Sequence, residues 1–298
     1  MNEKRQAHLA LLGANLFYGA GFSVAKTVMP SLIAPSAFIL IRVSCATILF
    51  WLSWLLGRSF RASISAEHRM RLIACAFFGV AANQLLFFKG LSLTSPIHAS
   101  LMMLLTPILV SVLAVWMAKE RLSAFNISGL LLGVCGASLL ILQSGKSAIA
   151  SDPFWGDFFI LLNAASYAIY LVIVKPLMQV YRPVIVIRWI FLIGTAMVLP
   201  FGLSDFRAIP WTMFGMAHYA AVIFIVVGVT FFTYLWNIYA LRILSSSIAG
   251  AYIYLQPLFA AIIAILFLGE EATWYKLLSG ILIFVGVYSA SHRKQEGK

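Results

Sequence analysis

The chain carries ten long apolar runs, and these runs constrain its fold more than any other feature of the sequence. They cover about residues 8–29, 35–56, 71–90, 96–118, 125–143, 156–178, 183–202, 214–241, 246–268 and 273–291. A helix that crosses a membrane needs roughly 20 predominantly apolar residues, because the hydrocarbon core is about 30 Å thick. A helix also satisfies its own backbone polar groups, which lipid cannot do. The runs therefore predict an all-α integral membrane protein with ten transmembrane helices.

Composition excludes a soluble fold and a nucleic-acid-binding protein. Hydrophobic residues make up 62% of the chain and charged residues 10%, against roughly 25% charged in soluble domains. The net charge of +12 forms no basic stripe, because lysines and arginines stand at the ends of the apolar runs. The three cysteines fall inside apolar runs and offer no metal-ligand spacing. We therefore expect membrane lipid around the chain, and no nucleic acid, metal or cofactor bound to it.

The placement of lysine and arginine predicts the orientation. If the N-terminus is cytoplasmic, the segments on that side hold thirteen of these residues and the opposite segments hold four, with the rest inside the runs. Cytoplasmic segments of membrane proteins carry such an excess. We therefore expect a bacterial inner (plasma) membrane protein with both termini in the cytoplasm.

The two halves of the chain repeat each other's landmarks. The stretch that ends at Glu120 aligns without a gap to the stretch that ends at Glu270, and this offset of 150 residues also pairs Pro107 with Pro257. Each half holds five runs, an odd number, so the second half must enter the membrane from the opposite side. Inverted repeats of this kind are associated with alternating access, although a duplicated bundle without transport remains the alternative. The predicted five-helix repeats are residues 8–143 and 156–291.

These landmarks resemble the EamA-type branch of the drug/metabolite transporter superfamily. The first run ends in FYGAGFSVAK and the second begins with PSAFILIR, which are similar to the family's Gly-aromatic opening and its Pro-x(6)-Arg helix. Lys119 departs from the pattern, since the family usually has glycine before the glutamate. The resemblance implies a central cavity lined by the first to fourth and sixth to ninth helices. It also implies transport of amino acids, other small metabolites or toxic organic compounds, commonly outward.

Charged side chains within the runs mark candidate substrate contacts, because a charge at mid-bilayer costs ~2.5–3.5 kcal/mol or more. Arg42 and Arg188 are each placed either to hold a substrate carboxylate or to extend to lipid headgroups, and the sequence leaves both readings open. No Asp or Glu lies deep within a run. His98 is the histidine expected near the cavity, where it is either a titrating group of the transport site or a packing residue with its hydrogen bonds satisfied. We therefore expect facilitated transport or counter-substrate exchange in preference to proton coupling.

Uncharged polar and aromatic side chains complete the candidate site. An amide facing lipid is costly, so these side chains should turn inward, where they either line a cavity or bond neighbouring helices. Pro107 and Pro257 each remove a backbone donor from the middle of a run and are candidate gating joints or static kinks. The candidates for the substrate cavity are Asn15, Tyr18, Arg42, Asn83, Gln84, His98, Asn163, Tyr167, Arg188, Trp236, Tyr252 and Gln256.

Together these features predict a secondary transporter of small organic metabolites, such as amino acids or drug-like compounds. It would act as an exporter or facilitator by alternating access, with a small-molecule substrate as its partner. A nucleotide-sugar or lipid-linked-sugar carrier of the same superfamily is one alternative, and a non-transporting membrane scaffold is another. An enzyme is not expected, because the sequence contains no nucleophile–base pair, metal-ligand cluster or phosphate loop.

Overall fold

The computed structural model describes residues 3–29, 32–56, 64–94, 102–143, 152–267 and 273–291, and every regular element in this part of the chain is a helix. The α-helices are α1 (Glu3–Lys26), α2 (Pro35–Leu56), α3 (Ala66–Ala76), α4 (Ala82–Leu93), α6 (Thr106–Ala118), α7 (Ala124–Gln143), α8 (Pro153–Ile173), α9 (Lys175–Val180), α10 (Pro183–Arg207), α11 (Met216–Ile223), α12 (Thr233–Ile243), α13 (Ser246–Ala251), α14 (Leu255–Phe267) and α15 (Trp274–Ser291). Two π-helices, η1 (Phe77–Ala81) and η3 (Phe224–Phe232), and two 3₁₀-helices, η2 (Trp211–Met213) and η4 (Tyr252–Tyr254), complete the set.

Within the described residues, each predicted membrane run overlaps a helix or consecutive helices. Six helical stretches of the described chain are long and apolar enough to cross a membrane: Pro35–Ser53, Ala66–Leu91, Phe154–Val180, Pro183–Arg207, Met216–Ile243 and Ser246–Ile263. The shorter apolar helices are Thr106–Ala118, Ala124–Leu139 and Trp274–Ala290. An all-helical architecture with several membrane crossings is therefore confirmed, and the count of ten crossings stays a prediction.

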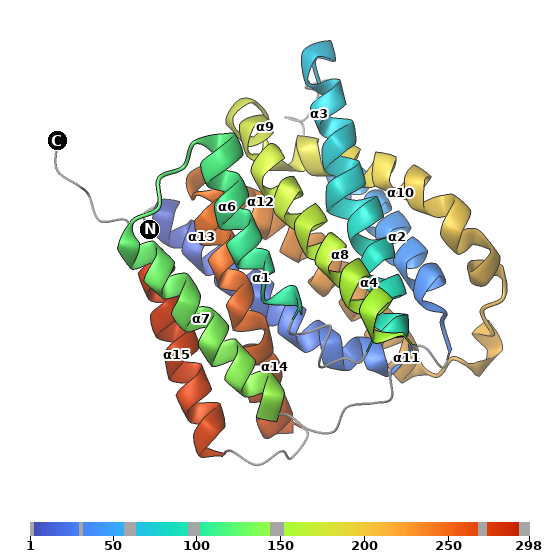
Figure 1. Ribbon diagram of the computed structural model, residues 1–298. Helices are drawn as coiled ribbons and strands as arrows, with labels where there is room; N and C mark the ends of the chain where they lie inside the picture. The colour runs from blue at the N-terminus through green and yellow to red at the C-terminus, as the bar shows by residue number, and fades with distance from the viewer. Residues whose placement is uncertain are drawn as a thin grey trace.

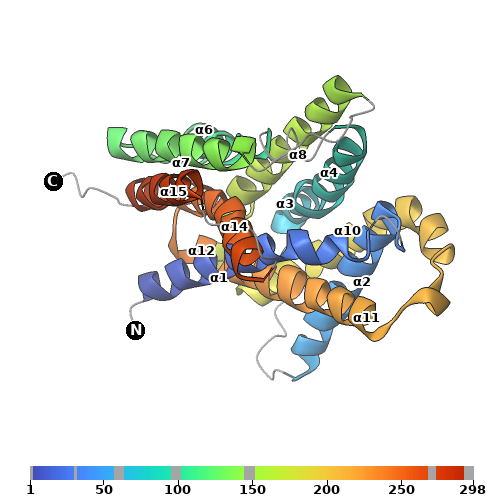
Figure 2. The same cartoon turned by 90° about the horizontal axis from the view of Figure 1, so that it is seen from below.

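Helices that hold equivalent places in the two halves pack against each other as antiparallel pairs. α7 and α15, the last helices of the two halves, lie side by side in both views (Figures 1 and 2). A Cβ added to Gly129 would lie 2.4 Å from the backbone nitrogen of Ala290, and one added to Gly136 would lie 2.7 Å from Leu282 Cβ. The contacted residue numbers fall along α15 as the residue numbers rise along α7, so α7 and α15 run in opposite directions. Small residues permit this close approach.

α2 and α10 form the second antiparallel pair of equivalent helices. The Oγ1 atoms of Thr47 and Thr195 lie 2.8 Å apart, and these residues are 148 positions apart in the chain. Ser36, near the start of α2, hydrogen-bonds to Asp205, near the end of α10. Two such pairs, at different edges of the bundle, are the geometry that an inverted repeat predicts.

Each half contains a π-helix in its third long helical stretch, η1 in one and η3 in the other. A Cβ on Gly79 would fall 2.4 Å from the Tyr170 ring, and one on Gly228 would fall 2.7 Å from the Phe17 ring. The glycines therefore let an aromatic side chain of α8 or α1 touch the π-helical backbone. The Tyr234 hydroxyl donates to the Gly79 carbonyl at 3.3 Å. π-helical turns of this kind are frequent at functional sites.

Pro107 and Pro257 lie in the first turns of helices and not within continuous ones. α6 begins at Thr106, directly after a turn, and α14 begins at Leu255, directly after η4. A proline is tolerated there because its missing N–H is not needed in a first turn. A proline disrupts the helical turn that precedes it, so a break before each proline is what a proline kink produces. Their gating role stays a prediction.

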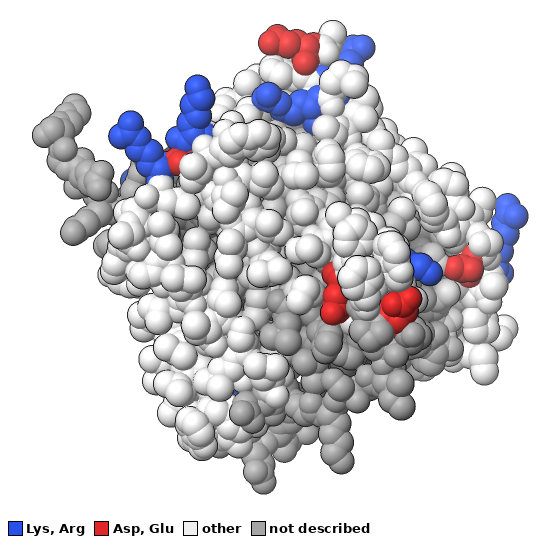
Figure 3. All heavy atoms as spheres, in the orientation of Figure 1, with Lys and Arg blue, Asp and Glu red and all other residues white. Residues whose placement is uncertain are grey.

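We call the end of the molecule at which α1 begins and α15 ends the terminal end (Figures 1 and 2). In the face shown in Figure 3, lysine and arginine lie along the upper and upper-left margin, over the start of α3 and the end of α6. A broad surface without charged side chains adjoins them in the same view. Charged ends around an uncharged belt are the surface expected of a membrane protein.

Candidate functional site

A polar cluster forms around Arg42 of α2, where elements from both halves meet. The Arg42 Nε donates a hydrogen bond to Thr230 Oγ1 at 3.2 Å, and its Nη1 donates to Gln84 Oε1 at 3.5 Å. The guanidinium carbon lies 5.9 Å from the centre of the Phe38 ring. Thr230 belongs to η3, and Gln84 follows η1 by three residues. The third long helical stretch of each half therefore supplies a partner to the same cation, Gln84 of α4 in one half and Thr230 of η3 in the other.

The two halves also touch within this cluster at equivalent residues. Gln84 and Tyr234 are 150 residues apart, which is the offset of the repeat, and Gln84 Nε2 donates to the Tyr234 hydroxyl at 3.5 Å. Gln84 Nε2 lies 3.3 Å from Asn83 Oδ1 as well. Because a contact between equivalent residues must lie near the axis that relates the halves, the cluster marks that axis. Substrate sites of inverted-repeat transporters lie at the repeat interface near the membrane midplane.

Tyrosines from α1 and α12 lie beside the guanidinium, and tyrosines of α8 lie next to them. Tyr18 of α1 lies beside Arg42 and Tyr234, and Tyr167 of α8 lies beside Tyr18. The ring centres of Tyr167 and Tyr170 are 5.9 Å apart. These side chains offer hydroxyl groups for hydrogen bonds and ring faces for an apolar or cationic part of a ligand.

No carboxylate contacts Arg42 in the part of the chain that the structure describes. The acidic side chains there lie at or near helix ends, at Glu3, Glu67, Glu120, Asp152, Asp157 and Asp205. A cation among neutral groups is expensive to hold away from water unless an anion or water compensates it. An arginine offers a carboxylate two parallel N–H donors, so the cluster is chemically suited to bind one.

The other amide candidates bond neighbouring helices to each other. Asn15 is buried, donates to Leu11 O at 2.7 Å and accepts from Gln256 Nε2 at 3.0 Å. Asn163 is buried and donates to Asn83 O at 2.5 Å. The bonds join α1 to α14 and α8 to α4. A role in helix packing accounts for these contacts, and a role in substrate binding stays a prediction.

Arg188, the second arginine candidate, lies in a different environment from Arg42. It is buried, and its guanidinium carbon lies 5.1 Å from the Trp51 ring and 6.0 Å from the Trp189 ring. Cation–π contacts of this kind are favourable when the cation is desolvated. Arg188 therefore packs among indole rings near the start of α10, and its contact with a substrate or with lipid headgroups stays a prediction. His98 lies outside the described residues.

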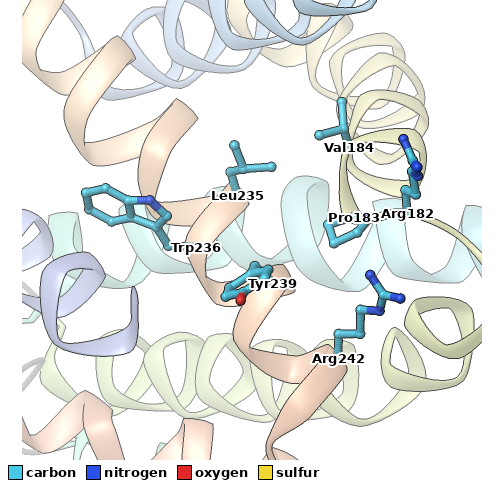
Figure 4. A pocket seen from close by; sticks show the side chains of 7 residues that line it. All are labelled: Arg182, Pro183, Val184, Leu235, Trp236, Tyr239 and Arg242. Carbon is cyan, nitrogen blue, oxygen red and sulfur yellow. The ribbon is translucent and has the colours of Figure 1, made fainter. Parts of the chain in front are cut away.

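The last two candidates lie toward the terminal end. The Tyr252 hydroxyl is 2.8 Å from His8 Nδ1, a contact between η4 and α1. Trp236 lines a pocket of about 530 Å³ between the start of α10 and α12 (Figure 4). The structure therefore places Tyr18, Gln84, Asn83 and Tyr167 with Arg42, and Trp236 in a separate pocket.

Glu120 joins three segments of the chain at the terminal end. Its Oε1 accepts from Lys175 Nζ at 2.8 Å and from Ser246 N at 3.0 Å, and its Oε2 accepts from Ser247 Oγ at 2.9 Å. The Ser247 N–H lies 3.4 Å from Oε2. The carboxylate therefore caps the start of α13 and ties it to the end of α6 and the start of α9. We call these four residues the clasp.

The electrostatics of the clasp favour an ionised carboxylate. Burial raises the pKa of Glu120, but the bond to the Lys175 ammonium, its charge, and the donors of Ser246 and Ser247 outweigh burial, so the pKa lies below its usual value of 4.5. Lys119, directly before Glu120, has a left-handed φ of 53°. That turn lets the Glu120 N–H return to Ala114 O at 3.0 Å and aims the carboxylate at its partners.

Sequence reasoning missed two parts of this picture. Thr230 was not singled out, although a threonine in a long apolar run was the available signal. Glu120 stands in the sequence only as the end of the repeated stretch, which does not predict its contacts with Lys175, Ser246 and Ser247. The available signal was that a lysine ends the first run of each half and a glutamate ends the fourth, at Lys26, Lys175, Glu120 and Glu270.

Comparison with known proteins agrees with this architecture. The EamA-like transporter family matches residues 5–142 and again residues 154–291. An uncharacterized transporter of Archaeoglobus fulgidus is 25% identical over 298 residues, which cover 99% of this chain and 100% of that protein. A "probable terminal-alkyne amino-acid exporter" of Streptantibioticus cattleyicolor is 25% identical over 222 residues, which cover 74% of this chain and 72% of that protein. A solved crystal structure has the same fold, with a TM-score of 0.79 at 17% identity over 96% of both chains. The chain belongs to the EamA-like transporter family and is a multi-pass integral membrane protein.

Proposed function

We propose that this protein is a secondary transporter that moves small organic solutes with a carboxylate group, amino acids above all, by alternating access. The observation that carries the proposal is the Arg42 cluster, where one guanidinium meets neutral polar groups from both halves. A substrate carboxylate would supply the missing negative charge, and the tyrosines would contact the rest of the solute. The relative named as an amino-acid exporter supports the same substrate class.

The alternatives fit the cluster less well. A nucleotide sugar carries a diphosphate, which usually requires several cations, and Arg42 is the one cation that the described residues bring to this cluster. A scaffold without transport would fill the repeat interface with apolar side chains, because a buried cation adds cost without benefit. The monoanionic substrate therefore accounts best for these residues.

The proposed transporter has ten spans in two inverted five-helix repeats, with both termini in the cytoplasm of a bacterial cell. The antiparallel equivalent pairs, α7 with α15 and α2 with α10, support the inversion. The basic terminal end supports the orientation. In this arrangement the clasp of Glu120 and Lys175 closes the cytoplasmic end, so it would have to break before the substrate site opens inward.

Counterflow in proteoliposomes tests the substrate class. Vesicles preloaded with each amino acid should accumulate the labelled form, and the matching amino-acid amide, which lacks the carboxylate, should not be carried. Arg42→Gln should weaken apparent affinity by about 10- to 100-fold, because a hydrogen bond to a charged group is worth ~1.5–3 kcal/mol. Arg42→Lys should keep part of the activity, and the exposed Arg207→Gln should keep all of it. Equal transport of amide and acid would refute the carboxylate assignment.

The same vesicles distinguish the coupling modes. We expect exchange against internal substrate to continue when an ionophore collapses the pH gradient. Loss of transport under that treatment would establish proton coupling in its place.

A double variant, Pro107→Ala with Pro257→Ala, tests the gating role of the prolines. If the helix breaks before these residues move during transport, the variant should fold and bind substrate but turn over more slowly. A normal rate would leave both prolines with a structural role alone.

A further inference from the structure

A pocket at the terminal end has the chemistry of a lipid-binding site and lies apart from the Arg42 cluster. Its volume is about 530 Å³, and it is open on one side. Two arginines, Arg182 and Arg242, lie at one side of it, Trp236 lies at the other, and Leu235 and Tyr239 lie between them (Figure 4).

The pocket attracts an anion from two directions. Arg182 is the N-cap of α10, and the positive end of this 25-residue helix dipole adds to the two guanidinium charges. Both arginine side chains are exposed. Guanidinium groups bind phosphate through paired N–H donors, and a helix start supplies further positive potential.

The pocket continues as an aromatic strip along α12 to the last residue of η3. Arg242, Tyr239, Trp236 and Phe232 follow each other at spacings of three and four residues, so they share one helix face. The rings of Trp236 and Phe232 are stacked, with centres 5.6 Å apart, and Phe232 is 38% exposed. The strip therefore changes from cationic at the end of the helix to aromatic and apolar further in.

The length of this strip matches one leaflet. Ten residues separate Phe232 from Arg242, which is about 15 Å along a helix at ~1.5 Å per residue. The hydrocarbon core is about 30 Å thick, so one leaflet contributes about 15 Å. With Arg242 at the headgroup level, Phe232 lies near the depth where an acyl chain ends.

We propose that this pocket binds an anionic phospholipid, whose phosphate lies between Arg182 and Arg242 and whose acyl chain lies along Tyr239, Trp236 and Phe232. A soluble phosphate compound would satisfy the arginines but would leave the aromatic strip unused. A zwitterionic lipid would meet two positive charges with its own cationic group, which is unfavourable. The combination of two arginines and an aromatic strip therefore selects an anionic lipid.

Native mass spectrometry of the purified protein in detergent tests this assignment, with dioleoyl-phosphatidylglycerol and dioleoyl-phosphatidylcholine as probes. The double variant Arg182→Gln, Arg242→Gln should lower phosphatidylglycerol affinity about 30-fold, since each basic residue near an anionic lipid contributes about fivefold. The control variant Arg71→Gln, Arg121→Gln removes the same charge from exposed positions outside the pocket and should change affinity less than twofold. Phosphatidylcholine should bind all three proteins equally weakly.

Three results would overturn the assignment. An equal loss in the control variant would mean that the net surface charge, and not the pocket, attracts the lipid. Full competition by glycerol 3-phosphate at the concentration of the lipid would mean that a soluble phosphate is the ligand. Unchanged affinity in the double variant would remove the site. If that variant does not fold, Arg242→Gln alone should show the fivefold loss, and Arg182→Lys with Arg242→Lys should retain binding.

Discussion

Replacing Glu120 by glutamine removes the charge of the clasp and preserves its shape. The side chains of Lys175 and Glu120 are 25% and 12% exposed, so solvent screens their 2.8 Å contact only in part. A hydrogen bond between charged groups contributes ~1.5–3 kcal/mol, while glutamine still offers Ser246 N an acceptor. We therefore expect the closed form to lose about 2 kcal/mol, which shifts the ratio of open to closed cytoplasmic ends about 30-fold toward open.

Spin-label distances in nanodiscs measure that ratio. Labels at the exposed positions Arg121 and Val180 report on opposite sides of the clasp, after the native cysteines are replaced by alanine. Glu120→Gln should enlarge the long-distance population, and Glu67→Gln, an exposed carboxylate at the same end, should leave it unchanged. In a Lys175→Met background, Glu120→Gln should add little, because the pair is already broken. A distance distribution that matches the native one in Glu120→Gln would refute the clasp as a closing contact.

Three further changes test separate parts of the structure. The pKa of Glu120 in the closed form lies below 4.5, so the charged clasp should be fully formed above pH 4.5. It should open as the pH falls through the pKa that Glu120 has in the closed form, and the same spin labels measure this opening. Gly79→Ala should lower the midpoint of thermal unfolding, because the added methyl overpacks the Tyr170 ring at a cost of about 1–3 kcal/mol. Gly280→Ala should leave the midpoint unchanged, because the nearest neighbour of its methyl is a leucine methyl at 3.3 Å. Lys119→Gly should raise the midpoint slightly, because glycine adopts a φ of 53° without the roughly 1–2 kcal/mol that a side chain costs there.

Helix positions and membrane class were predictable because lipid imposes one strong condition on every span. A run such as 183–202 needs only length and apolarity to be identified as a helix, and α10 indeed covers it. The departures within helices were not predictable in this way. The π-helical turns at Gly79 and Gly228 depend on contacts with Tyr170 and Phe17 of distant helices, which no local periodicity records.

The candidate site was predictable by residue type and not by partner. Arg42 and Gln84 were identified because charge and amide groups are costly in lipid, a condition that acts on each residue alone. Which arginine faces the neutral cluster and which lies against indole rings depends on helix rotation, so Arg42 and Arg188 could not be distinguished from the sequence. Lys119 shows the same limit: its departure from the family's glycine was visible, but its left-handed φ was not.

The end of α8 links the cluster to the clasp, and this link sets a thermodynamic condition. Tyr170 and Leu171 lie near the end of α8, and Val174 separates that helix from α9, which begins at Lys175 of the clasp. Leu171 O accepts a hydrogen bond from Ser246 Oγ, a second residue of the clasp, at 3.1 Å. A substrate that bound the open and closed forms equally would not move the clasp at all. The factor by which a substrate shifts the clasp must therefore equal the factor by which opening the clasp changes substrate affinity. If Glu120→Gln moved the spin labels while a saturating substrate left them in place, the clasp and the Arg42 cluster would be independent, and this cluster could not be the site that alternating access exposes.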